Sequence, residues 1–192
     1  MLGDSISMGY MRFVQEALKE AAEVFRPAEN CQGTNHGVKS IDAWLAIEGG
    51  KWDVIHFNFG LHDLKHVDPQ TGRNSENPND PQQADPDLYR KNLEEIILKL
   101  KATGAKLIFA TTTPFPPNPA GPYRDPEQVV IYNKIALALC EKYGIAVNDL
   151  CSFALPRLDE LQQPANVHFK TEGSKALGEQ VALSIKKMLS SE

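Results

Sequence analysis

The sequence lacks the features that mark membrane, nucleic-acid-binding and disulfide-stapled proteins. No apolar run approaches the ~20 residues that a transmembrane helix needs, and no stretch resembles a signal peptide. The formal net charge is −5 at pH 7 and no basic run is present, so the sequence offers no positive patch to a phosphate backbone or an anionic membrane. The three cysteines are odd in number and lack C-x-x-C spacing, which argues against both a disulfide framework and a zinc site. We therefore expect a soluble protein that binds neither nucleic acid nor membrane.

Short apolar runs alternate with amphipathic segments along the chain. Three of these runs indicate strands: residues 51–60, 104–113 and 143–150. Their almost continuous apolar character is typical of parallel strands covered on both faces. A further strand is indicated at residues 23–30, where Pro27 would confine it to an edge or an end. We expect one domain over residues 1–192, a three-layer α/β/α sandwich with a parallel sheet.

Proline and glycine mark where the intervening helices begin and end. Asp85, followed by proline, is expected to cap a helix that ends at Gly104. Asp125, also followed by proline, is expected to start a helix that ends at Gly144. A last helix begins near Thr171, because apolar residues recur four positions apart beyond it.

Two long loops interrupt this alternation. Residues 64–86 are polar and rich in proline and asparagine, and residues 113–126 contain six prolines. Both loops follow strands, at the sheet edge where open α/β folds bind their ligands. We therefore interpret them as walls of a site, although residues 64–86 could instead be a linker between domains.

Three short motifs fall on that same edge. Ser5, in a Gly-Asp-Ser triplet, is either a catalytic nucleophile or only the cap of a helix that starts there. The sequence Gly-Leu-His-Asp, residues 60–63, follows the strand at 51–60, and His168 precedes the last helix. A serine and a histidine brought to one edge favour nucleophilic catalysis, because a neutral imidazole can take the proton from a hydroxyl.

The order and spacing of these motifs resemble those of the SGNH (GDSL-type) hydrolases, over essentially the whole chain. The resemblance implies a flavodoxin-like domain in which Ser5 is the nucleophile and His168 the general base. It also implies an oxyanion hole formed by the N–H groups of Ser5 and Gly33 and by the side chain at position 62. Gly37 is the alternative to Gly33, because a small residue lets a backbone N–H approach a ligand.

The third motif departs from the family pattern at position 62. The family has Asn there, whereas this sequence has His62. An imidazole can replace the amide because it donates through one N–H, provided that the proton is on the correct nitrogen. The alternatives are a histidine that only satisfies a turn and a replacement of the amide by Asn58.

A second departure concerns the triad acid. The family usually has Asp three residues before the histidine, and this sequence has Ala165. Either a Ser–His dyad operates or another group orients the imidazole. Asn166 is the nearest candidate, and Asp149 is a remote one that is more typical of a turn.

A third departure lies at the start of the chain. A nucleophile in a strand-to-helix turn needs a preceding strand, and residues 1–2 are too short to be a central one. We expect the first strand to be truncated here and the native polypeptide to extend upstream. A leader in that segment would make the protein secreted or periplasmic; otherwise it would be cytoplasmic.

These residues together predict a hydrolase of carboxylic esters that works through a serine acyl-enzyme without metal or organic cofactor. The resemblance and the polar loops favour a small acyl group, such as acetyl, on a carbohydrate or another small polar substrate. The alternatives are an acyltransferase on the same fold and a catalytically impaired carbohydrate-binding relative.

The remaining histidines are interpreted as hydrogen-bonded or surface residues: His36, His56 and His66. Arg124, in the proline-rich loop, is interpreted as a solvated residue, and the alternative is that it contacts an anionic or sugar substrate.

Overall fold

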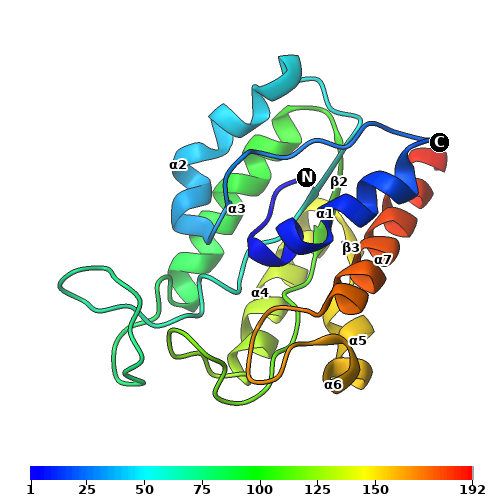
Figure 1. Cartoon of the computed structure of the whole chain (residues 1–192). Helices are drawn as coiled ribbons and strands as arrows, with labels where there is room; N and C mark the ends of the chain where they lie inside the picture. Colours follow the sequence, from blue (N-terminus) through cyan, green and yellow to red (C-terminus); the bar gives the residue numbers. More distant parts are fainter. Residues whose placement is uncertain (192) are drawn as a thin grey trace.

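A parallel sheet organises the computed structural model, which describes residues 1–191 (Figure 1). Its strands are β1 (Val54–Phe57), β2 (Lys106–Ala110) and β3 (Ala146–Asn148), side by side in the order β1-β2-β3. Phe57 lies opposite Phe109, and Phe109 opposite Val147. Each strand falls within one of the apolar runs, and their parallel direction confirms the predicted α/β class.

The first residues of the chain extend this sheet on the free side of β1. Leu2 forms a parallel bridge with Phe57, its N–H donates to the carbonyl of His56 (2.9 Å), and its carbonyl accepts from the N–H of Asn58 (3.1 Å). This single bridge takes the place beside β1 that a strand leading into Ser5 would occupy.

The strand predicted at residues 23–30 is wrong. This segment runs beside the first residues and makes only separate contacts there, such as the bond from the Met1 amino group to the Phe25 carbonyl (2.6 Å). Just beyond it, the N–H of Cys31 donates to the carbonyl of Gly3 (3.2 Å). Pro27 has no N–H, so a regular ladder could not continue through it.

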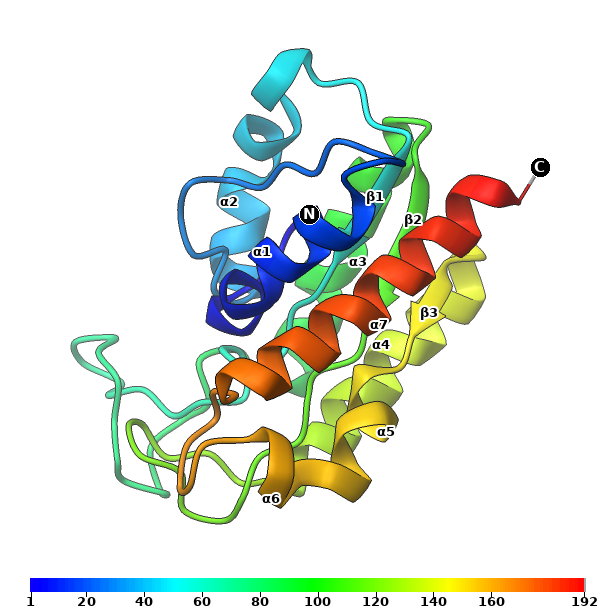
Figure 2. The same ribbon diagram turned by 45° about the vertical axis from the view of Figure 1, so that its right-hand side comes forward.

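Helices cover both faces of the sheet (Figure 2). One layer contains α1 (Ser5–Leu18) and α7 (Thr171–Ser190), and the other contains α2 (Thr34–Leu45), α3 (Pro86–Ala102) and α4 (Gln128–Tyr143). Four short helical turns complete the described elements: η1 (Ile47–Gly49), α5 (Leu150–Ala154), η2 (Leu155–Arg157) and α6 (Leu158–Leu161). No helix among the described residues combines the length and the apolar character needed to cross a bilayer.

The helix boundaries lie close to the capping, proline and glycine residues that predicted them. The Asp85 side chain caps α3 by accepting from the N–H of Leu88 (2.8 Å), and α7 begins at Thr171 as predicted. The helix α4 begins at Gln128, slightly later than predicted, because Asp125 instead accepts from the N–H of Glu127 (2.9 Å) in a turn before the helix. It ends at Gly144, whose φ of +67° suits a residue without a side chain.

Close packing between α1 and α7 fixes the relative positions of their N-terminal ends. A Cβ on Gly178 would lie 2.7 Å from the Cβ of Phe13 and 3.0 Å from the carbonyl oxygen of Tyr10, so only glycine allows this approach. Gly173, in the first turn of α7, is equally restricted, because a Cβ there would lie 2.1 Å from the carbonyl oxygen of Leu161. The start of α1 and the loop that enters α7 are thereby held together.

The two long loops lie at the end of the molecule where the strands finish (Figure 1). Hydrogen bonds join them: the N–H of His66 donates to the carbonyl of Tyr123 (3.0 Å), and the N–H of Tyr123 donates to the carbonyl of Ser75 (2.8 Å). Both loops are therefore ordered against each other beside the sheet edge that carries the three motifs.

Candidate active site

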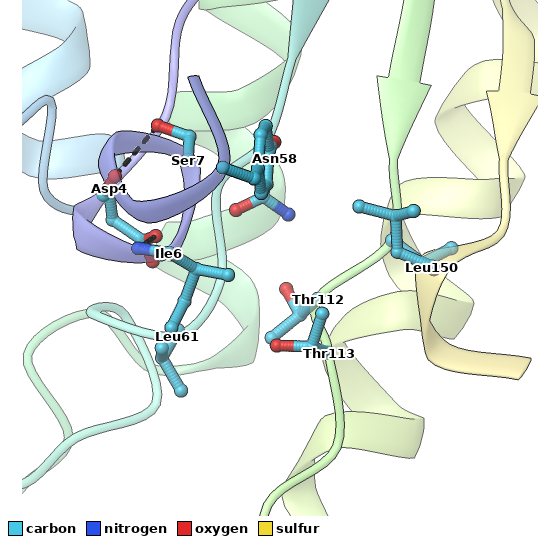
Figure 3. Close-up of a pocket in the computed structure, with 10 residues that line it drawn as sticks. Asp4, Ile6, Ser7, Asn58, Leu61, Thr112, Thr113 and Leu150 are labelled. Atoms are coloured by element: carbon cyan, nitrogen blue, oxygen red, sulfur yellow. Dashed lines mark hydrogen bonds between the residues drawn. The ribbon is translucent and has the colours of Figure 1, made fainter. Parts of the chain in front are cut away.

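Ser5 is the first residue of α1, and Asp4 is the residue that caps the helix. The Asp4 carboxylate accepts from the N–H of Ile6 (2.9 Å), and the Ser7 hydroxyl donates to the Asp4 carbonyl (2.7 Å), as Figure 3 shows. Burial raises the pKa of Asp4 to about 6. Since Asp4 supplies the cap, the hydroxyl of Ser5 remains free for other partners, and the interpretation of Ser5 as only a helix cap is wrong.

A continuous hydrogen-bonded chain connects Ser5, His168 and Asn166. The Ser5 Oγ lies 2.9 Å from His168 Nε2, and His168 Nδ1 lies 2.8 Å from Asn166 Oδ1. The same amide oxygen accepts from the backbone N–H of His168 (3.0 Å), which identifies that atom as the oxygen of the amide. Because an oxygen can only accept, the ring proton belongs on Nδ1, and Nε2 is left to accept from the serine hydroxyl.

The loop that carries His168 is held by Gln162. Its side-chain nitrogen donates to the carbonyls of Val167 and Pro114, both at 2.9 Å. Partial desolvation and, after it, the charge of Arg124 lower the pKa of His168 below its usual 6.5. At neutral pH the imidazole is therefore uncharged, as a general base requires.

No carboxylate in residues 1–191 hydrogen-bonds to His168. Ala165 occupies the position of the family's acid, at a φ of +48°. Asp149, the remote candidate, instead caps α5 by accepting from the N–H of Ser152 (3.1 Å) and also accepts from the Thr111 hydroxyl (2.9 Å). Asn166 is thus the residue that the structure places behind the imidazole.

The two backbone N–H groups predicted for the oxyanion hole have no acceptor in residues 1–191. Gly33 precedes α2, and neither its N–H nor that of Ser5 donates a hydrogen bond to any of the described residues. Gly37, the alternative to Gly33, lies inside α2, where its N–H donates to the Gly33 carbonyl (3.0 Å) and is not available.

Asp63 fixes the position of Gly33. Its buried carboxylate accepts from both the N–H (2.7 Å) and the hydroxyl (2.6 Å) of Thr34, the residue after Gly33. A Cβ on Gly33 would lie 3.0 Å from each carboxylate oxygen, so a larger residue would disturb this contact. Burial raises the pKa of Asp63 to about 7, and the Thr34 hydrogen bonds oppose that rise. The sequence identified Asp63 only as part of a motif, and its contact with Thr34 came from the structure.

Gly60 allows the turn that contains His62. Its φ is +150°, and a Cβ would lie only 2.1 Å from the hydroxyl oxygen of Thr112. Any side chain at this position would push the turn away from β2, where Thr112 follows the strand.

His62 carries an uncharged imidazole with an unused nitrogen. Its Nδ1 is fully buried and has no hydrogen-bond partner among the described residues, whereas its Nε2 is neither fully buried nor hydrogen-bonded and can be reached by a ligand. Burial, and then the charges of Lys65 and Arg124, lower the pKa of His62 to about 3. Asn58, the alternative donor, uses one N–H of its amide to bind the carbonyl of Ala110 (2.7 Å).

Arg124 is not a solvated side chain, contrary to the interpretation of the sequence. Only 7% of its surface is exposed, and its Nε donates to the carbonyl of Leu61 (3.1 Å). Lys65, which the sequence did not single out, is 8% exposed. Its place two residues after the Gly-Leu-His-Asp motif is the one signal that could have identified it.

The other histidines have ordinary partners. His36 contacts Glu29 (3.1 Å), His56 contacts Asn148 (3.3 Å), and His66 packs edge-on against Tyr123. In the part of the chain that the structure describes, no three His, Cys, Asp or Glu side chains are grouped as metal ligands.

Comparison with known proteins identifies the family. The model of the GDSL-like lipase/acylhydrolase family matches residues 1–176. The chain belongs to this family. No protein with a curated description matches the sequence. The members of this family are esterases and acylhydrolases, so the chain is an enzyme of the ester-hydrolase class.

Solved structures agree with the fold of this GDSL-family chain. The acetyl xylan esterase AlAXEase superposes with a TM-score of 0.74 at 17% identity, covering 96% of this chain and 97% of the esterase. The lipase/acylhydrolase from Enterococcus faecalis gives 0.72 at 21% identity, covering 97% and 93%. A carbohydrate esterase family 3 protein from Talaromyces cellulolyticus gives 0.66 at 14% identity, covering 100% and 97%. At these identities the likeness establishes the fold, which confirms the predicted SGNH-type architecture.

A cleft of about 230 Å³ opens beside Ser5 in this GDSL-family fold. Its walls come from α1, from the loop before α7 and from the first turn of α7. The lining residues are Ser5, Ile6, Gly9, Gln163, His168, Phe169 and Ser174. A second cavity, of about 10 Å³, lies beneath the start of α1 and has room for no more than about one water molecule (Figure 3). The larger cleft is therefore the space that a group attached to Ser5 would enter.

Proposed function

We propose that this GDSL-family hydrolase cleaves carboxylic esters through an acyl-enzyme formed on Ser5. The observation that carries the proposal is the hydrogen-bonded chain from Ser5 Oγ through His168 to Asn166 Oδ1, at 2.9 and 2.8 Å. A serine hydroxyl is a weak nucleophile until a neighbouring base accepts its proton, and the base must itself be held in the correct tautomer. Both requirements are met by side chains already in contact.

The reaction follows from these contacts. His168 Nε2 takes the hydroxyl proton as Ser5 Oγ bonds to the ester carbon, and the carbonyl oxygen becomes an oxyanion. The oxyanion accepts hydrogen bonds from the N–H groups of Ser5 and Gly33 and from Nε2 of His62 in the tautomer that is protonated there; none of the three donates to another described residue. As the tetrahedral intermediate breaks down, His168 gives its proton to the departing alcohol. A water molecule activated by the same imidazole then releases the acid from Ser5.

Asn166 acts in this mechanism as a positioning residue. Its amide oxygen holds the ring proton on Nδ1, which is the function that Asp performs in the family pattern. An amide supplies no negative charge, so the imidazolium formed during attack is stabilised less than it would be by a carboxylate.

The dimensions of the cleft favour a small acyl group. Its volume of about 230 Å³ lies below the ~300–1,000 Å³ typical of small-molecule sites, and Gln163 and Ser174 make part of its wall polar. Acetyl and similar short groups fit such a space better than a long lipid chain. The resemblance of the fold to an acetyl xylan esterase and to a carbohydrate esterase supports an acetylated carbohydrate, or a similarly polar compound, as the substrate.

Acyl specificity and covalent labelling test this function together. We expect the purified chain to hydrolyse p-nitrophenyl acetate to butyrate faster than octanoate and decanoate, and a fluorophosphonate probe to label Ser5. Ser5→Ala should abolish both, whereas Ser190→Ala, an exposed serine at the far end of α7, should change neither. Labelling of a different serine, or turnover by the Ser5→Ala variant, would overturn the assignment. Capture of the acyl group by an added sugar alcohol, in preference to water, would instead identify an acyltransferase.

A further inference from the structure

Lys65 and Arg124 are two buried cations beside the proposed oxyanion hole. Their side chains are 8% and 7% exposed, respectively. Among the described residues neither forms an ion pair with a carboxylate, and Lys65 Nζ makes no hydrogen bond. Their terminal nitrogens are nevertheless not sealed in, because they are absent from the fully buried atoms that lack partners. Each side chain thus has a buried stem and a charged tip that reaches the surface.

A hydrogen bond holds Arg124 against the turn that carries His62, and the backbone of Lys65, three residues after His62, is fixed by Gln83. Arg124 Nε donates to the carbonyl of Leu61 (3.1 Å), the residue before His62, and the carbonyl of Lys65 accepts from the N–H of Gln83 (2.8 Å). The two charges also act on the catalytic groups: both lower the pKa of His62, and that of Arg124 lowers the pKa of His168. The cations are therefore part of the same site as the nucleophile.

The protein's own acidic groups do not neutralise this pair by contact. Asp4 and Asp63 are the carboxyls near enough to influence the two cations, Asp4 acting on Arg124 and Asp63 on Lys65. Their hydrogen bonds are used elsewhere, by Ile6 and by Thr34. Two neighbouring cations whose stems are buried and whose tips have no hydrogen-bonded anion leave their donors open to a ligand that carries negative charge.

We propose that Lys65 and Arg124 bind a carboxylate carried by the ester substrate, so that the enzyme selects anionic esters over neutral ones. The proposal rests on the ester hydrolysis assigned to Ser5. The guanidinium of Arg124 offers the planar pair of donors that suits a carboxylate, and Lys65 adds a point charge. The carboxylate can belong to the acyl part or to the alcohol part of the ester, and both sources present the same chemistry to the two cations.

Two matched pairs of chromogenic esters separate these sources. For the acyl side, p-nitrophenyl hemisuccinate is compared with p-nitrophenyl butyrate. For the alcohol side, 5-acetoxy-2-nitrobenzoate is compared with p-nitrophenyl acetate, and every rate is divided by that of spontaneous hydrolysis. We expect kcat/KM for the anionic member of one pair to exceed that of its neutral partner by about tenfold to a hundredfold, the range given by charged hydrogen bonds.

Substitution of Lys65 then tests whether the buried pair causes the preference. Lys65→Met keeps the apolar stem but removes the charge, and it should reduce the anionic-to-neutral ratio about tenfold or more. The control is Lys134→Met, which changes the net charge equally at an exposed position on α4 and should leave the ratio unchanged. Added salt should reduce the anionic-to-neutral ratio of the parent only slightly. Ion pairs with partly buried charges are screened less by salt than pairs between fully exposed charges.

A binding measurement keeps the proposal independent of turnover. Titration calorimetry with 5-hydroxy-2-nitrobenzoate and with succinate should show binding by the parent that Lys65→Met weakens and Lys134→Met does not, with 4-nitrophenol as the neutral probe. If neutral esters are hydrolysed but neither anionic ester is preferred and neither anion binds, the anion site is refuted and the hydrolase stands. If no ester is hydrolysed and Ser5 is not labelled, the hydrolase is refuted, and the titration alone decides whether the cations bind an anion.

Discussion

The two halves of the site are built differently. On the proton-transfer side, Ser5, His168 and Asn166 are already joined by hydrogen bonds of 2.9 and 2.8 Å, and His168 is exposed. On the oxyanion side, the Gly33 N–H and the ring of His62 have no hydrogen-bond partner in the described chain, although buried Asp63 fixes their surroundings. In the proposed mechanism, one half is complete without a ligand, and the other receives a charge that appears only during the reaction.

This difference has a physical reason. A base must already contact its nucleophile for the proton to move, whereas an oxyanion donor is most useful when nothing competes for it before the oxyanion forms. Keeping such donors free costs stability, because unpaired polar groups are desolvated. The contacts of Asp63 with Thr34 and the tight fit of Gly60 against Thr112 hold the surrounding backbone in place. The donors therefore cannot turn toward other partners.

The largest effect is expected on the proton-transfer side. His168→Ala removes the base, and kcat for p-nitrophenyl acetate should fall by about four to six decades. Because Ser5 and His168 act as a unit, the double variant with Ser5→Ala should be no slower than either single variant. Losses that multiply in the double variant would show that the two residues act independently and would contradict the hydrogen-bonded chain as the catalytic unit.

The oxyanion side should give a smaller loss. His62→Ala removes one of three donors, so kcat should fall by about 10²- to 10³-fold while KM changes little. His62→Asn restores an N–H donor and should recover part of the rate. Steady-state kinetics give kcat and KM of both variants and of the parent. A kcat equal to that of the parent in both variants would mean that His62 only fills the turn and that two backbone donors suffice.

In the proposed site, the positions of Ser5 and His168 follow local sequence patterns more closely than the surroundings of His62 do, for a physical reason. Helices and strands follow local patterns, so Asp85, Gly144 and Thr171 marked boundaries that the structure confirms to within a few residues. Ser5 and His168 lie at such boundaries and could be placed by spacing alone. The environment of His62 depends on Arg124, which is about sixty residues away in sequence and is buried by a loop that has no regular pattern.

The failure at residues 23–30 has a similar origin. Its composition permits a strand, but a strand also needs a partner with a free edge along several residues. The segment makes isolated contacts instead, such as those of the Phe25 carbonyl with the Met1 amino group and of the Val24 carbonyl with the Gln15 side chain. Pairing of this kind is decided by tertiary structure and not by the apolar pattern of one segment.

A smaller effect is expected from the residue behind the imidazole. Asn166→Ala frees the ring to rotate and change tautomer, and kcat should fall by about tenfold to a hundredfold, the value of one hydrogen bond to a group that becomes charged. Ala165→Asp restores the acid of the family pattern at a φ of +48°, which Asp tolerates better than Ala. In that background Asn166→Ala should cost less, and equal losses in both backgrounds would show that Asp at position 165 does not reach the ring.

The smallest expected effect is a shift of the pH profile, and it connects the two halves of the site. Only neutral His168 accepts the Ser5 proton, so activity on a neutral ester should rise with pH through the pKa of His168 and fall as the ring becomes protonated. Partial desolvation and the charge of Arg124 lower that pKa, which places the acidic limb of kcat/KM below pH 6.5. Arg124→Gln removes the positive charge while retaining a polar side chain, so protonation of His168 becomes easier and the limb should move to higher pH. Lys134→Met, which removes a charge far from the site, is the control and should not move the limb. A profile of p-nitrophenyl acetate hydrolysis at constant ionic strength measures the shift, and a limb that stays in place or moves to lower pH in Arg124→Gln would show that Arg124 does not act on the catalytic base.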